Sequence, residues 1–138
     1  MDFELSEDQL ALQHAAADLL DTMATSVRVR DVAAGPRHLD DDLWSAMADQ
    51  GWTAVDAPVD EGGLGLGTVE ISVLAEQLGR HVAPVPFVGT VSAAAALRRA
   101  LAAGEVAAGD VLGDRPVAGW LEALSSGEAV GAVGWATP

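Results

Sequence analysis

A glycine-rich segment is the feature of this sequence most suggestive of ligand chemistry. Residues 62–67 read Gly-Gly-Leu-Gly-Leu-Gly and stand directly before a predicted helix, and the N-terminus of a helix can bind phosphate through its free backbone N–H groups. The context argues against this use, because no predicted strand precedes the segment and no lysine follows it in the phosphate-loop pattern. Asp60 and Glu61 would also repel an anion. We therefore favour a structural role, in which the glycines allow a tight turn and close helix packing.

Histidine and aspartate side chains are the other candidates, as bases or metal ligands. His14, His38 and His81 are far apart in the sequence, and surface or capping roles are the alternative to a ligand role for each. The run Asp40–Asp42 could hold a divalent cation, but it lacks the spacing and the glycine of a calcium loop. It precedes a predicted helix, where carboxylates cap free N–H groups, so we favour capping.

Composition excludes several classes of function. The 138 residues carry 21 acidic and 7 basic side chains, a net charge of −14, and all the basic ones are arginine. Nucleic acid and anionic membranes are therefore not expected partners, since both need basic patches. The absence of cysteine excludes disulfides and thiolate metal sites. No signal peptide and no apolar run of about 20 residues are present, so we expect a soluble, cytoplasmic protein.

The elements that must position any site are helical. Ser6 and Gln9 form the pattern of a capping box at the start of the first helix. A weaker pattern within residues 25–39 indicates a short helix, and residues 51–67 are predicted to be a loop. Apolar periodicity predicts this first helix at residues 7–24 and further helices at residues 41–50, 68–80, 87–103 and 116–126.

Two of these helices lead to more specific expectations. Asp114 is expected to cap the helix over residues 116–126, with Pro116 in its first turn. The helix over residues 87–103 is apolar nearly all round, which is typical of a buried helix. We expect Phe87 and Leu97 to lie on an apolar surface through which the chain associates.

The end of the chain follows a different pattern. β-branched residues alternate from residue 129 onward, which predicts a strand over residues 129–136. A lone strand has no partner. We therefore expect a helical domain over residues 1–127, followed at residues 128–138 by the start of a truncated β-domain.

Five stretches together resemble the N-terminal helical domain of the flavin-dependent acyl-CoA dehydrogenases, and the alanine-rich, lysine-free composition resembles their actinobacterial branch. They are residues 1–9, Leu43-Trp44 with Gly51-Trp52, residues 58–65, residues 76–80 and residues 121–132. The resemblance implies an all-α fold, followed in the complete enzyme by a middle β-domain and a C-terminal helical bundle. It also implies FAD between those two further domains, and a catalytic carboxylate that no residue of this chain matches.

The resemblance also suggests residues for the acyl pocket. Pro86, Phe87, Thr90 and Val91 occupy the segment that lends walls to this pocket in the family; core packing is the alternative. We predict that the chain alone neither binds FAD nor has activity.

Three interpretations remain open for the chain as a whole. The first is the N-terminal part of an acyl-CoA dehydrogenase that contributes pocket walls and oligomer contacts. The second is a non-catalytic helical subunit that completes a partner dehydrogenase chain. The third is a helical scaffold that has lost its role.

Overall fold

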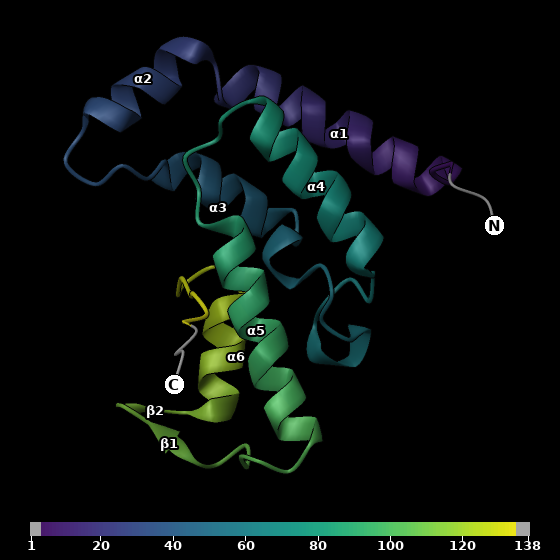
Figure 1. Ribbon diagram of the computed structural model, residues 1–138, viewed down its shortest axis with the longest axis vertical. Helices are drawn as coiled ribbons and strands as arrows, with labels where there is room; N and C mark the ends of the chain where they lie inside the picture. The colour runs from purple at the N-terminus through teal and green to yellow at the C-terminus, as the bar shows by residue number, and fades with distance from the viewer. Residues whose placement is uncertain (1–3, 135–138) are drawn as a thin grey trace. The chain divides into compact units, whose positions relative to one another are not determined.

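The computed structural model describes residues 4–134 (Figure 1). These residues form two compact units. The first unit comprises the residues up to Trp44 together with Leu66–Val85. The second comprises Ser45–Gly65 together with the residues from Pro86 onward. None of the helices in the described range is both long enough and apolar enough to cross a membrane.

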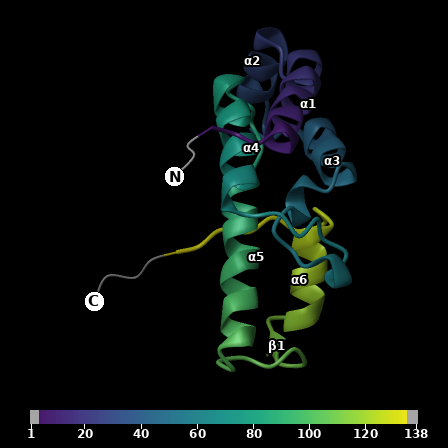
Figure 2. The ribbon, with the colours of Figure 1, turned by 90° about the vertical axis from the view of Figure 1, so that its right-hand side faces the viewer.

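The first unit is built on the pairing of α1 with α4, which lie side by side in Figures 1 and 2. The helices of this unit are α1 (Glu7–Met23), α2 (Ser26–Ala34), the first turn of α3 (Asp41–Asp49), and α4 (Thr68–Arg80). Ala16 and Leu20 of α1 and Leu74 of α4 are buried. Burial of this apolar surface is the main force that holds the unit together.

Side chains fix the N-termini of both long helices. Ser6 Oγ accepts a hydrogen bond from the Gln9 N–H at 3.2 Å, and Gln9 Oε1 accepts one from the Ser6 N–H at 3.0 Å. The predicted capping box is therefore confirmed. Gln9 Nε2 also donates to Glu70 Oε1 at 2.7 Å, and Glu70 Oε2 accepts from the Gly67 N–H at 2.8 Å. The polar groups that begin α1 and α4 thus bind each other.

The second unit places α5 against α6, as both views show (Figures 1 and 2). Its core includes Trp52, Val55, Phe87 and Val117, all buried. Its elements are the 3₁₀ turns η1 (Trp52–Ala54) and η2 (Val59–Glu61), the helices α5 (Phe87–Ala102) and α6 (Val117–Ser125), and the strands β1 (Val111–Leu112) and β2 (Arg115–Pro116).

The hairpin of β1 and β2 corrects the expected start of the last helix. Leu112 pairs with Arg115 in antiparallel register, so Gly113 and Asp114 form the two-residue turn, with Gly113 at φ 69°. Asp114 is needed in the turn and does not cap α6. Pro116 is the N-cap residue instead, and this hairpin has no counterpart in the helices and strand predicted from sequence.

Two further expectations are wrong. Phe87 is 1% exposed and belongs to the core, so it does not lie on a surface. Residues 129–134 form no strand within the part of the chain that the structure describes. The alternating pattern predicts extended backbone, but a strand also needs a ladder partner, and the Gly131 N–H binds the Thr90 side chain instead. Residues 1–3 and 135–138, including the end of the expected strand, lie outside the described residues.

Candidate functional site

An apolar groove of about 570 Å³ lies in the second unit. All of its twelve lining residues are alanine, glycine, valine, leucine or tryptophan, although a fifth of the chain (20%) is charged. We call it the apolar groove. It is lined by Ala93, Ala96, Leu97 and Ala100 of α5, Leu112 of β1, Trp120 and Leu124 of α6, and residues 130–134.

The helix α5 lines the groove because it carries two apolar stripes. Phe87, Val91 and Ala94 are buried and follow one another at helical spacing. The second stripe is made by residues 93, 96, 97 and 100, which also recur at helical spacing and line the groove. A helix that is apolar nearly all round thus covers the core with one stripe and leaves the other available.

Trp120 contributes an aromatic face whose polar atom is already bound. Its Nε1–H donates to the Leu112 carbonyl at 2.8 Å, and the Arg115 guanidinium lies 5.0 Å from the ring centroid. Arg115 in turn pairs with Glu128 at 2.8 Å, which raises the pKa of the arginine. These contacts fix the ring while the groove keeps an apolar lining.

The four residues predicted to line an acyl pocket are brought together, but in the core. Phe87, Thr90 and Val91 are buried in the first turns of α5, and Pro86 before them is half-buried. The apolar groove is lined by the next turns of the same helix. In the sequence, the second apolar stripe over residues 93–100 is the pattern that could have indicated these groove-lining residues.

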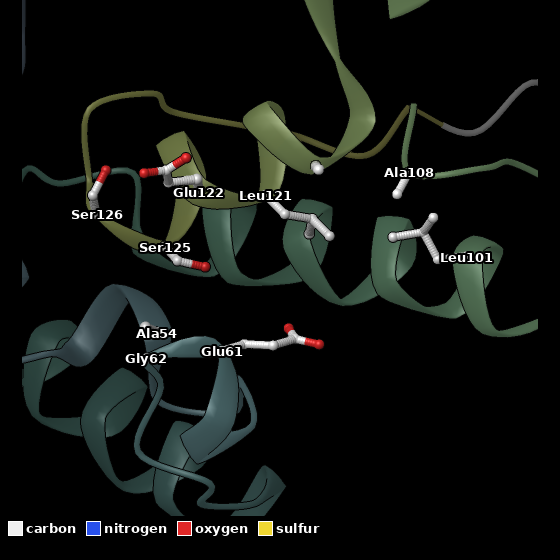
Figure 3. Close-up of a pocket in the computed structure, with 10 residues that line it drawn as sticks. Ala54, Glu61, Gly62, Leu101, Ala108, Leu121, Glu122, Ser125 and Ser126 are labelled. Atoms are coloured by element: carbon white, nitrogen blue, oxygen red, sulfur yellow. The ribbon is translucent and has the colours of Figure 1, made fainter. Parts of the chain in front are cut away.

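A second cavity, of about 580 Å³, is more polar (Figure 3). We call it the polar cavity. Its lining includes Glu61, Glu122 and Ser125 together with apolar residues such as Leu101 and Leu121. Figure 3 shows Glu61 and Ser125 extending into the space between residues 54–62 and the helices α5 and α6.

Arg98 binds the polar groups at this cavity. Its guanidinium donates to Asp56 Oδ1 at 3.2 Å and to Ser125 Oγ at 3.1 Å, while Nε lies 3.7 Å from Glu61 Oε2. The side chains of Arg98 and Asp56 are only 15% and 19% exposed. Thr53 Oγ1 also donates to the Ser125 carbonyl at 2.6 Å. These bonds tie residues 53–61 to both helices, so the cluster acts as a structural clamp.

The backbone N–H groups of the glycine-rich loop are hydrogen-bonded within the same segment of the chain. Four successive N–H groups donate to carbonyls of residues 54–59 at 2.8–3.1 Å, those of Gly62, Gly63, Leu64 and Gly65. A Cβ on Gly63 would lie 2.1 Å from the Ala57 carbonyl oxygen, which explains the need for glycine. The pyrophosphate of FAD requires free donors or cations. The N–H groups of residues 62–65 are already bonded, and Asp60 and Glu61 next to them are acidic, so this loop does not fit the pyrophosphate of FAD.

His38, His81 and the aspartate run have structural partners. Asp40 Oδ1 accepts from the Leu43 N–H at 3.1 Å and so caps α3, as predicted. The Arg28 guanidinium forms two hydrogen bonds of 2.8 Å with Asp40 and holds the pKa of that carboxyl below its usual value. His38 Nδ1 lies 2.9 Å from the Ala33 carbonyl oxygen. No cluster of three metal-ligating side chains occurs among residues 4–134.

Comparison with known proteins gives consistent matches along the chain. The family model for the acyl-CoA dehydrogenase N-terminal domain matches residues 6–108. Acyl-CoA dehydrogenase IpdE2 of Mycobacterium tuberculosis is 31% identical over 128 residues, which cover 92% of this chain and 36% of that protein. The chain therefore spans about a third of the length of this curated relative.

Solved structures share the fold. The ChsE4-ChsE5 complex from Mycobacterium tuberculosis matches with a TM-score of 0.73 and 26% identity, over 94% of this chain and 33% of that chain. The Tcur3481-Tcur3483 steroid ACAD matches with a TM-score of 0.64 and 39% identity, over 67% of this chain and 26% of that chain. The fold is thus that of the helical N-terminal region of acyl-CoA dehydrogenases. The chain belongs to the acyl-CoA dehydrogenase N-terminal domain family.

Proposed function

We propose that the chain is the N-terminal helical part of an FAD-dependent acyl-CoA dehydrogenase, which desaturates the Cα–Cβ bond of an acyl-CoA thioester. Membership of the family over residues 6–108 supports this activity for the whole enzyme. The glycine-rich loop does not fit FAD, and no carboxylate lines the apolar groove. In this proposal the flavin and the catalytic base are therefore supplied by other parts of the enzyme.

The contribution of this chain is a wall for the acyl group. The observation that carries this role is the apolar groove, whose volume of about 570 Å³ is within the range of small-molecule sites. Each methylene that leaves water for such a surface gains about 0.8 kcal/mol. Ala93, Ala96 and Leu97 are the residues proposed to contact the acyl chain.

Pro86, Phe87, Thr90 and Val91 have a supporting role in this proposal. This role is supported by the burial of Phe87, Thr90 and Val91 in the turns of α5 that precede the groove-lining stripe. A change at one of them would act on the acyl group by moving the helix that contacts it.

A second candidate is a non-catalytic subunit that completes the pocket of a partner dehydrogenase chain. One structural relative is a complex of two proteins, ChsE4 and ChsE5. In either case we propose that the chain acts in an oligomer. Exposed apolar residues of the second unit, such as Val88 and Val111, are available for such contacts.

Purification from source cells with an antibody against the chain tests both candidates. A flavin-containing polypeptide much larger than 14.1 kDa that oxidises acyl-CoA supports the first. A 14.1 kDa chain that co-purifies with a second, flavin-containing dehydrogenase polypeptide supports the alternative. Material with neither flavin nor acyl-CoA oxidation contradicts both.

A further inference from the structure

The hydroxyl of Thr90 joins two backbone segments of the second unit. It donates to the Pro86 carbonyl at 2.7 Å and accepts from the Gly131 N–H at 3.2 Å. A threonine hydroxyl has one donor and two acceptor sites, so both bonds can exist together. The Thr90 side chain is fully buried, at 0% exposure. The Thr90 hydroxyl therefore joins residues 129–134 to α5 through a buried hydrogen bond.

Two glycines allow the backbones to approach this closely. A Cβ on Gly89 would lie 2.7 Å from the Gly131 carbonyl oxygen. A Cβ on Gly131 would lie 2.6 Å from Ala93 Cβ and 3.0 Å from Leu124 Cδ2. Real Cβ atoms do not tolerate such distances, so a side chain at either position would push the two segments apart.

The fastened segment is itself a wall of the apolar groove. Residues 130–134 line it together with Ala93 and Leu124, the two residues that Gly131 approaches. We propose that Thr90 is a positioning residue that fixes this wall, and that the Thr90–Gly131 contact thereby sets the width of acyl group that the groove admits. The assignment of acyl-group width rests on the proposed function, whereas the positioning role of Thr90 does not.

Small side chains make the groove sensitive to the position of this wall. The lining stripe of α5 contains three alanines and one leucine, so its width depends mainly on the distance between backbones. Loss of the Thr90 bond, or an added methyl at Gly131, should therefore move the wall away from α5 and admit broader acyl groups.

Amide exchange and nuclear Overhauser contacts of the 138-residue chain test the positioning role. Thr90→Val keeps the shape of the side chain but removes the hydroxyl, and should speed exchange of the Gly131 N–H about tenfold and weaken the contact between the Ala93 methyl and the Gly131 α-protons. Thr90→Ser should restore both. Thr22→Val is the matched control, because the exposed Thr22 hydroxyl also bonds a carbonyl four residues back. Unchanged Gly131 exchange in Thr90→Val overturns the positioning role.

The proposed control of acyl-group width by the Thr90–Gly131 contact is tested on the flavoprotein that contains the chain. Gly131→Ala and Thr90→Val should raise kcat/KM for a ring-bearing acyl-CoA, relative to a straight-chain one of equal carbon number, by about tenfold. Gly109→Ala is the control, because Gly109 is exposed, lies outside the lining of the groove, and has nothing within 4 Å of its added Cβ. An unchanged ratio, with faster Gly131 exchange, overturns the width assignment alone. A flavoprotein that oxidises neither substrate overturns the proposed function and the width assignment, while amide exchange still decides the positioning role.

Discussion

Replacement of Arg98 by methionine tests the clamp at the polar cavity. The change removes the charge that faces Asp56 and the donor to Ser125 Oγ, but keeps most of the apolar stem. Removing one partner of a fully buried ion pair costs about 3–5 kcal/mol, because the other charge is left uncompensated. Both side chains retain some exposure, at 15% and 19%, and the contact of 3.2 Å is longer than an ideal one. We therefore expect a loss of about 2–3 kcal/mol in the free energy of unfolding.

Thermal and urea denaturation followed by circular dichroism would measure this loss. For a chain of this size it corresponds to a fall in Tm of about 8–12 °C. The neighbouring Arg99 is exposed, so Arg99→Met is the matched control and should stay within about 0.5 kcal/mol of the parent chain. Adding Asp56→Asn to Arg98→Met should recover part of the loss, since the largely buried carboxylate is then removed and the remaining one, Glu61, is 54% exposed. If Arg98→Met and Arg99→Met have the same Tm and the same urea midpoint, the clamp does not stabilise the chain.

Three further predictions follow from other contacts. Ser6→Ala should cost about 1 kcal/mol through loss of the cap, and a melting curve that coincides with the parent's would refute this. Gly63→Ala should cost more than about 2 kcal/mol, whereas Gly109→Ala, where nothing lies within 4 Å, should unfold like the parent; equal Tm values would show that the 51–65 loop can relax. His81 lies between the Asp21 carboxylate at 3.0 Å and a carbonyl oxygen at 2.8 Å, and these partners raise its pKa. Its contribution is therefore complete below the unfolded-state pKa of about 6.5 and is lost as pH rises through the higher folded-state pKa. The Tm difference between the parent and His81→Gln should accordingly shrink from about pH 5.5 to about pH 8.5, and a difference that grows would contradict the assignment.

Local signals in the sequence are sufficient to predict most of the helices. The capping box of Ser6 and Gln9 and the glycine at the end of α5 depend on residues close together in the chain. Gly104, at φ 72°, ends that helix with hydrogen bonds from residues 104 and 105 back to residues 101 and 100. Such features are set by neighbours, so composition and spacing predict them.

Contacts between distant residues could not be predicted in the same way. Arg98 binds residues 42 positions before it and 27 positions after it, and no local pattern distinguishes it from the exposed Arg99. The hydroxyl of Thr90 binds the backbone of a residue 41 positions away, and the family resemblance that suggests Thr90 for an acyl pocket does not predict this bond. The alternation at residues 129–134 predicted a strand because spacing shows periodicity and does not show whether a partner strand is present.

Acyl-CoA kinetics of an Ala96 variant test the central claim most directly. In the flavoprotein that contains the chain, Ala96→Leu adds a side chain to the apolar groove, whereas Ala95→Leu adds the same side chain at an exposed position outside its lining. If the added side chain displaces two methylenes of the acyl group, it costs about 1.6 kcal/mol. We therefore predict that Ala96→Leu lowers kcat/KM roughly fifteenfold for a long-chain acyl-CoA and little for a short-chain one, and that Ala95→Leu changes neither. Equal effects of the two variants at every chain length would contradict the assignment of the groove as an acyl wall.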